Sequence, residues 1–329
     1  MIRTLVFAIA LLSAASAARA DPPPDAPWVS AYETGHPLAG SIWQPAQERF
    51  VTPEAVAAAL GQARIVLLGE KHDNADHHRL QAWLVTSLAS ANRRPAVAFE
   101  MLAKDDQSLI DAQVKKAPNN ARGLAVAVRW DEKGWPEWHL YEPIFEAVLR
   151  AGLPILATNL SRATIKALAV DGSSALNSDL VREYGLDRPL APELNQRLTE
   201  ELKASHCGHA SPKTIEKMIL VQRARDAQMA RRLATVGGKD GAVLMAGAFH
   251  VRKDEGVPVH LAKSDRDGVV SLAFVEVRDE ATDPGEYAKR FGSDRLPFDF
   301  VWFTPRVDDE DPCEKFAKQL QQMKKRPSD

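Results

Sequence analysis

Cysteine is scarce in this chain: Cys207 and Cys313 are the only two among 329 residues. So low a count excludes a small scaffold held by several disulfides, and it excludes a zinc site with four cysteine ligands. An even number in an exported protein is still compatible with one disulfide. We expect these two cysteines to form it, with two unpaired thiols as the alternative.

Several common functional motifs are also missing. The chain has no G-x-S-x-G nucleophile elbow, no P-loop and no G-x-G-x-x-G after an expected strand. Strong charge of one sign is absent as well, because 42 basic and 44 acidic residues leave a formal net charge of −2. Nucleic acid and anionic membrane surfaces are therefore not expected partners.

An apolar run occurs at the N-terminus, but it is too short to span a bilayer in the mature protein. Residues 1–20 read MIRTLVFAIALLSAASAARA, with Arg3 before the apolar stretch and small residues after it. This pattern predicts a cleaved signal peptide. No cysteine lies near the expected cleavage site, so lipid attachment is not expected. We predict a periplasmic protein that has no transmembrane segment and begins near Asp21.

The rest of the chain predicts an α/β fold. Residues 21–51 start proline-rich and are expected to form an extended leader. Short apolar runs then alternate with helical periodicity, which is typical of a mainly parallel β-sheet flanked by helices. We expect strands at 64–70, 95–100, 154–160, 241–250, 270–277 and 298–303, and helices at 52–60, 77–90, 140–152 and 214–237. Residues 161–213 predict a smaller helical cap inserted into a single domain, 52–329.

Ionisable residues follow four of these expected strands. They are Glu70 and His72, then Glu100, Arg162 and His250. Ligands of parallel sheets bind at the carboxyl ends of the strands, so these residues should share one edge. Glu70, His72, Glu100 and His250 are candidate ligands of a divalent metal, with a polar network around an anion as the alternative. Arg162 is expected to pair with Glu100 or with a carboxylate of the ligand.

Polar residues on two helices are further candidates. His77 lies on the inward face of its helix start, where it is either a ligand or a locally satisfied histidine. His78 is expected to be solvated. Gln222 and Asp226 interrupt the apolar stripe of the long helix, so they either support the site or bond neighbouring groups.

Aromatic residues gather in one segment, with Trp130, Trp135 and Trp138 followed by Tyr141. Such a segment either forms the wall of a large flat ligand or packs against the sheet. Tyrosinate binds ferric haem iron in some proteins, so Tyr141 and, in the cap, Tyr184 are candidate ligands. No C-x-x-C-H sequence occurs, and any haem would therefore be bound non-covalently.

The chain resembles the ChaN-like haem-binding family, part of a wider group with Tiki proteases and erythromycin esterases. The matching segments span about residues 64–261, in order LLGEKHDNADHH, VAFEML, ILATNLSR, HCGH, VQRARDAQMA and GAFHVRKDEGVPVHL. The resemblance implies haem or iron handling at the bacterial cell envelope. In the Tiki branch, a Gly-x-x-His motif and strand-end carboxylates imply metal-dependent hydrolysis, and here they match Gly247, His250, Glu70 and Glu100.

Two functions follow as hypotheses. The first is an exported haem-binding protein in haem or iron uptake, with haem or a similar small molecule as its partner. The residues of its pocket would include His77, Tyr141, Arg162, Tyr184, Gln222 and Asp226. The alternative is a metal-dependent hydrolase with Glu70 and Glu100 as catalytic residues. A homodimer is open under either hypothesis, and no residue pattern establishes it.

Overall fold

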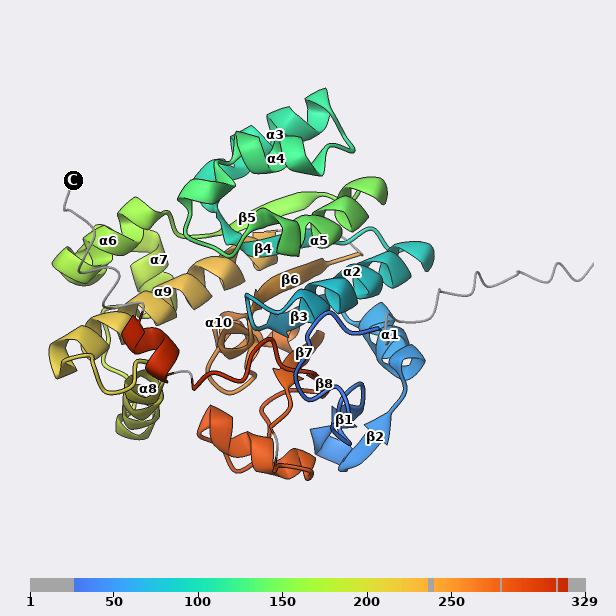
Figure 1. Cartoon of the computed structure of the whole chain (residues 1–329). Coiled ribbons are helices and arrows are strands. Elements are labelled where there is room, and N and C mark those ends of the chain that lie inside the picture. The colour runs from blue at the N-terminus through green and yellow to red at the C-terminus, as the bar shows by residue number, and fades with distance from the viewer. Residues whose placement is uncertain (1–26, 236–239, 279, 312, 319–329) are drawn as a thin grey trace, which may run out of the picture.

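The computed structural model describes residues 27–235, 240–278, 280–311 and 313–318. This part of the chain contains an eight-stranded sheet in the order β2-β1-β8-β7-β3-β6-β4-β5 (Figure 1). The strands are β1 (Ile42–Gln44), β2 (Arg49–Val51), β3 (Ile65–Glu70), β4 (Ala96–Ala103), β5 (Ile155–Asn159), β6 (Ala242–Gly247), β7 (Val269–Glu276) and β8 (Phe300–Thr304). The predicted signal peptide, residues 1–20, lies outside the described residues.

The predicted mainly parallel sheet is confirmed. Neighbouring strands from β8 to β5 run parallel, whereas β1 pairs antiparallel with β8 and with β2. Every residue of β3 is buried, as expected for a continuous apolar run in the centre of a parallel sheet. The strand predicted over 241–250 ends at Gly247, because the 3-10 helix η5 (Ala248–Val251) follows and carries His250.

The N-terminal segment differs from the prediction. Residues 21–51 were expected to form an extended leader, but β1 and β2 belong to the sheet and are joined by η1 (Pro45–Gln47). Ile42 is 1% exposed and lies in the core. The expectation is therefore wrong for residues 42–51, because strands of three residues are too short to show a period of two.

Helices cover both faces of the sheet, as predicted. On one face, Val66 and Leu68 pack in a core with α1 (Pro53–Gln62), α2 (Ala75–Ser90), α3 (Gln107–Lys116), α4 (Ala121–Ala127) and α5 (Trp138–Arg150). On the other face, Ile65 and Leu67 pack in a second core with α9 (Pro212–Thr235), α10 (Val257–His260) and η6 (Pro284–Phe291). Consecutive residues of β3 thus alternate between the cores. Two short helices complete the loops, η2 (Lys104–Asp106) and α11 (Lys263–Arg266).

The predicted helical cap is present beside α9 (Figure 1). It consists of α6 (Arg162–Asp171), η4 (Gly172–Ala175), α7 (Ser178–Tyr184) and α8 (Pro192–Ser205). Two small apolar clusters attach it to α9: one around Leu168 and Leu180, and one around Leu198. The cap therefore has little core of its own and depends on α9 for its packing.

The two cysteines form a disulfide. Cys207, after α8, is bonded to Cys313 near the C-terminal end of the described chain, at a sequence separation of 106 residues. The bond ties the C-terminal segment to the cap. Among the described residues, we find no helix with the length and apolar character needed to cross a membrane.

Candidate functional site

The sheet topology brings the predicted strand-end residues together. Strands β3, β6 and β4 are parallel neighbours, so their carboxyl ends meet at one edge. Glu70 ends β3, Glu100 lies late in β4, and His250 follows β6. Both glutamates are buried, at 2% and 1% exposure. Two carboxylates in such a setting need charged or hydrogen-bonded partners.

Glu70 receives its partners from three elements. Its Oε1 accepts a hydrogen bond from the Tyr141 hydroxyl at 2.7 Å and lies 2.9 Å from His72 Nδ1. His78 Nε2 is 3.4 Å from the same oxygen. Burial disfavours the carboxylate charge, but His78 and His72 outweigh it and hold the pKa of Glu70 below its usual value.

Glu100 is surrounded by donors. Its Oε1 accepts a hydrogen bond from Arg225 and lies 3.3 Å from His250 Nε2. Its Oε2 accepts from the backbone N–H of Gly247 at 2.7 Å and is 3.8 Å from His72 Nε2. Burial alone would raise its pKa, but the positive charges of His250, Arg225 and His72 hold the pKa of Glu100 well below its usual range.

Two residues of α9 contact the ring of His250. Its Nδ1 lies 2.6 Å from Asp226 Oδ1 and 3.2 Å from Gln222 Nε2. Burial disfavours the imidazolium, yet the charges of Glu100 and Asp226 raise the pKa of His250 to about 9. Gln222 and Asp226 therefore contact the site directly, which is the first of the two roles that the sequence left open.

The donor atoms do not fit a metal ion. The described residues contain no group of three or more His, Cys, Asp or Glu side chains that could hold one. The predicted ligands pair with one another instead: His72 with Glu70, and His250 with Glu100. Arg225 forms a further ion pair with Glu100. The structure therefore does not support the predicted divalent metal. The same residues form the polar network that was the alternative.

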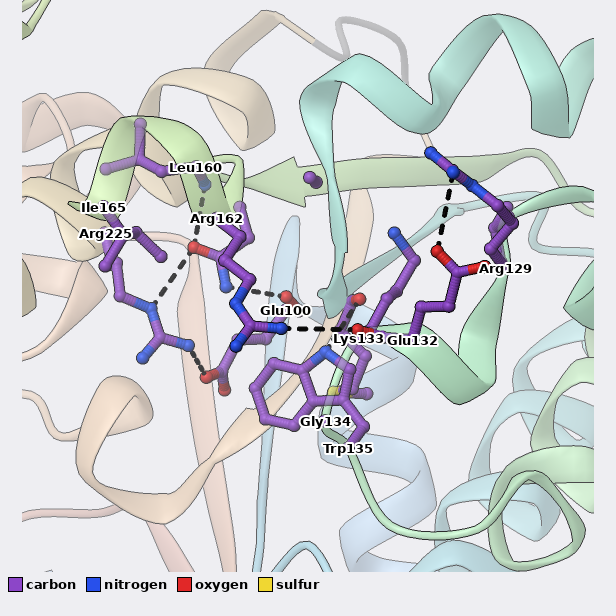
Figure 2. A pocket seen from close by; sticks show the side chains of 14 residues that line it. Glu100, Arg129, Glu132, Lys133, Gly134, Trp135, Leu160, Arg162, Ile165 and Arg225 are labelled. Atoms are coloured by element: carbon purple, nitrogen blue, oxygen red, sulfur yellow. Dashed lines mark hydrogen bonds and ion pairs between the residues drawn. The ribbon is translucent and has the colours of Figure 1, made fainter. Parts of the chain in front are cut away.

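A cavity of about 530 Å³ opens beside this network (Figure 2). Apolar side chains form much of its wall: Met101, Val128, Trp135, Leu160 and Ile165. Charged side chains line it as well: Glu100, Arg129, Glu132, Lys133, Arg162 and Arg225. Glu100 and Arg225 thus belong both to the cavity wall and to the network behind it.

The arginines differ in how they are held. Arg225 is fixed between Asn159 Oδ1, at 3.2 Å, and Glu100. Arg162 donates instead to the backbone carbonyl of Glu132 at 3.5 Å, across the mouth of the cavity (Figure 2). The predicted Arg162–Glu100 pair is therefore wrong. Arg162 begins α6 at the rim, and Arg225 reaches the carboxylate from α9.

The aromatic segment contributes both to the core and to the wall of the cavity. Trp130, in η3 (Trp130–Glu132), is 2% exposed and packs edge-on against Trp138 at 5.1 Å between ring centroids. Trp135 lines the cavity, and its Nε1 donates to the backbone carbonyl of Met101 at 3.0 Å. One tryptophan thus fills the core, and another forms a fixed wall of the cavity.

Neither candidate tyrosine lines the cavity. Tyr141 is fully buried, and burial together with the Glu70 charge raises the pKa of its hydroxyl. Tyr184 lies in the cap with its ring 5.8 Å from that of His260, and burial raises its pKa to about 12. The geometry therefore favours neither tyrosine as a tyrosinate ligand in this cavity.

The paired histidines at the start of α2 face different surroundings. His77 is locally satisfied: Nδ1 accepts from the Lys71 N–H at 2.9 Å, and Nε2 is 2.8 Å from Thr304 Oγ1. His78 was expected to be solvated, which is wrong, because it is fully buried and donates from Nδ1 to the Leu140 carbonyl at 2.9 Å. Helix α2 packs against α5 as well as against the sheet, so its buried face is wider than one stripe.

Some site residues were not predicted from the sequence. Arg225 had a detectable signal, because Gln222, Arg225 and Asp226 lie three and four positions apart and share a helix face. Arg129 and Lys133 had none, since they stand in an irregular segment without periodicity. Lys133 is held by Asp106 at 2.7 Å, which only the fold brings near.

Comparison with known proteins gives one family. A search of curated proteins found no match. The family model described as "Haem-binding uptake, Tiki superfamily, ChaN" matches residues 56–261, more than half of the chain.

Several solved structures are similar to this chain, and the first one named here shares its fold. One described as "Cofacial heme binding to ChaN of Campylobacter jejuni" is 24% identical, with a TM-score of 0.59, over 79% of this chain and 95% of that chain. A Bacillus cereus protein is 14% identical, with a TM-score of 0.42, over 73% and 76% of the two chains. An erythromycin esterase mutant is 15% identical, with a TM-score of 0.40, over 81% and 82%.

Proposed function

The chain belongs to the haem-binding uptake family of ChaN type in the Tiki superfamily, and from this premise we propose that it binds haem non-covalently in the cavity beside Trp135. The observation that carries the proposal is a cavity with apolar walls and cationic side chains at its mouth. Haem is a large apolar ring with two anionic propionates. The ring matches the apolar side chains of the wall, and the propionates match the cationic side chains.

The size and composition of the cavity support this ligand class. Its volume of about 530 Å³ lies within the range of roughly 300–1,000 Å³ that is usual for small-molecule sites. Trp135 offers an aromatic face, and Leu160 and Ile165 are apolar neighbours for a macrocycle.

The rim arginines are suited to propionates. The side chain of Arg129 is 73% exposed, and its ion pair with Glu132, at 3.5 Å, is equally open to solvent. Such exposed pairs contribute little free energy, so a ligand carboxylate can replace Glu132 at small cost. Arg162 bonds a neutral carbonyl and gains a charge-assisted, bidentate hydrogen bond when a carboxylate arrives.

A haemin titration of the mature protein tests the proposal, followed by visible absorption and tryptophan fluorescence. We expect saturable binding with one haem for each cavity. Arg129→Ala and Arg162→Ala should each weaken binding about tenfold, the effect of losing one charge-assisted hydrogen bond. Arg150→Ala is the matched control, because Arg150 is an exposed arginine paired with Glu146 outside the cavity. Non-saturating haem uptake, or equal affinity in all variants, would contradict the proposal.

Export to the periplasm belongs to the same proposal. The predicted signal peptide over residues 1–20 supports it, and the Cys207–Cys313 disulfide is of the kind that persists in oxidising compartments. The mass of protein purified from the periplasm should correspond to a chain that starts near Asp21. The homodimer stays a prediction, which sedimentation with and without haemin would test.

One observation favours hydrolysis as a second candidate function. Asp226, His250 and Glu100 form a buried chain, with 2.6 Å and 3.3 Å between successive donor and acceptor atoms, and Glu100 reaches the cavity. Such coupled acid and base groups occur in catalytic sites. Turnover of ester or peptide substrates that Glu100→Gln abolishes would support this function, and no turnover by the wild-type protein would reject it.

A further inference from the structure

A cluster of ion pairs connects α8, the last helix of the cap, to the loop that follows His250. Arg252 of this loop is 1% exposed, and its Nη1 donates to Glu201 Oε2 of α8 at 2.7 Å. The same guanidinium donates to both carboxylate oxygens of Asp254, at 3.0 and 2.8 Å. From the cap, Arg197 Nε donates to Glu255 Oε1 at 2.6 Å. Helix α8 thus contributes one base and one acid to the cluster, and the loop 252–255 contributes the other three members.

This cluster holds one carboxylate more than it holds guanidinium groups. Glu201, Asp254 and Glu255 face two arginines, so one negative charge is in excess when every group is ionised. The neighbouring Lys253 does not compensate it, because its Nζ pairs with Asp299. The side chain of Glu255 is 4% exposed, and its Oε2 accepts no hydrogen bond from the described residues. An excess of negative charge in such a setting is costly, and the uptake of one proton relieves it.

Glu201 is the carboxyl group best placed to take up that proton. Asp254 has both of its oxygens bonded to Arg252, whereas Glu201 accepts through Oε2 and its side chain is 18% exposed, which gives a proton access from solvent. Burial raises the pKa of Glu201 from 4.5 to about 7. The charge of Arg252 opposes this rise, and the charges of Glu255 and Asp254 add to it.

The apolar attachment of α8 is small. Within this helix Leu198 alone is buried, and it packs with Ile215 and Ile219 of α9. After the helix ends, the disulfide between Cys207 and Cys313 forms a further connection. A helix with so little buried apolar surface belongs to the parts of a protein that open locally at low cost in free energy. The charge state of the ion-pair cluster therefore has a strong influence on whether α8 stays docked on the loop 252–255.

We propose that α8 is a proton-controlled latch of the cap, which docks on the loop 252–255 with a proton bound to Glu201 and loosens when that proton passes to solvent. The docked state binds the proton more tightly than the open state. Docking is therefore strongest at acid pH and weakens as the pH rises from about 4.5 to about 7. Loosening frees one end of the cap, whose other end, α6, supplies Arg162 and Ile165 to the cavity wall.

Hydrogen exchange of the full mature protein without ligand, followed by mass spectrometry from pH 5 to 8 and corrected for the intrinsic exchange rate, tests the latch. In the wild-type protein, the opening equilibrium of α8 should rise about tenfold between pH 5 and 7, since a pKa difference of one unit gives a factor of ten and partial exposure of Glu201 reduces the full effect. Glu201→Gln stays neutral, so its α8 should be equally protected at both ends of the range. The control is Glu200→Gln, an exposed glutamate of the same helix, which should behave as the wild type.

Glu255→Gln keeps the proposal falsifiable if Glu201→Gln fails to fold. It removes the excess negative charge, so Glu201 should titrate near its ordinary pKa and α8 should be equally protected from pH 5 to 8. Protection of wild-type α8 that does not change with pH, or a tenfold change that persists in the folded glutamine variants, would overturn the proposal. So would an equal change in β3, because the proton would then act on the unfolding of the whole domain and not on the latch.

Discussion

Two histidines beside Glu100 have opposite settings. His72 and His250 follow the neighbouring strands β3 and β6, and each turns Nε2 toward the Glu100 carboxylate. The ring of His250 is 3.3 Å from that carboxylate and has Asp226 behind it, whereas the ring of His72 stands 3.8 Å away. The same residue type at the same edge is buried in a close ion-pair network in one place, and in the other it is 31% exposed and farther from the carboxylate.

This difference shows that hydrogen-bond partners, more than residue type or strand position, determine the role of a histidine. His250 is one of three positive groups that neutralise Glu100, together with Arg225 and His72. His72 is hydrogen-bonded to the other glutamate, Glu70, and lies farther from Glu100, at 3.8 Å. We therefore assign His250 the role of neutralising Glu100 and His72 the role of a hydrogen-bond partner of Glu70.

The largest effect should come from removing the carboxylate that both histidines face. Glu100→Ala leaves the Arg225 charge without its carboxylate and His250 with Asp226 alone, which should lower the free energy of unfolding by about 3–5 kcal/mol. Urea denaturation measures this loss. The control Glu132→Ala removes an exposed glutamate and should stay within about 0.5 kcal/mol of the wild type. A loss below about 1 kcal/mol in Glu100→Ala would show that the network is not energetically coupled.

The charge of His250 should appear as a pH dependence of stability. Its pKa is raised from 6.5 to about 9, so its contribution is complete below pH 6.5 and is lost as the pH rises through 9. The loss should be on the order of 3 kcal/mol, since one pKa unit corresponds to about 1.4 kcal/mol. Thermal unfolding from pH 6 to 10 measures it. Asp226→Asn should flatten the profile, and a wild-type profile that is already flat would contradict the assignment.

On the His72 side, Tyr141→Phe removes the hydroxyl that donates to Glu70. The expected loss of stability is about 1.5–3 kcal/mol, the range for a hydrogen bond to a charged group. Because Tyr141 is buried and does not line the cavity, haemin affinity should not change. A loss of stability below about 0.5 kcal/mol would contradict the hydrogen bond from Tyr141 to the Glu70 carboxylate.

The smallest effect concerns the second contact of His250. Gln222→Ala removes an amide 3.2 Å from Nδ1 but leaves Asp226 in place. Because the amide N–H and the protonated Nδ1 are both donors, the change should cost less than about 0.5 kcal/mol. Chemical denaturation measures the cost, and haemin affinity should not change. A decrease in haemin affinity of tenfold or more would mean that His250 takes part in binding.

The fold was largely predictable because its signals are local. Each of the six long apolar runs forms a strand within the sheet, and the rule that parallel strands expose their ligand sites at the carboxyl ends placed Glu70, Glu100 and His250 together. Strands β1 and β2 were missed because three residues carry no readable alternation. The pairing of β1 with β8 is a contact between distant parts of the sequence.

The pairing within the site was less predictable. Sequence spacing showed that Gln222 and Asp226 face inward, but it did not show that Arg225, and not Arg162, reaches Glu100. Nor did it show that His78 is buried against α5. These outcomes depend on how α2, α5 and α9 cross the sheet, which is set by packing between elements far apart in the chain.

The most direct test of the account is the position of the iron in crystals of the mature protein grown with haemin, located by anomalous scattering at the iron absorption edge. The account predicts one iron in each cavity, next to Trp135. An iron outside the cavity, or none, would contradict haem binding at this edge of the sheet.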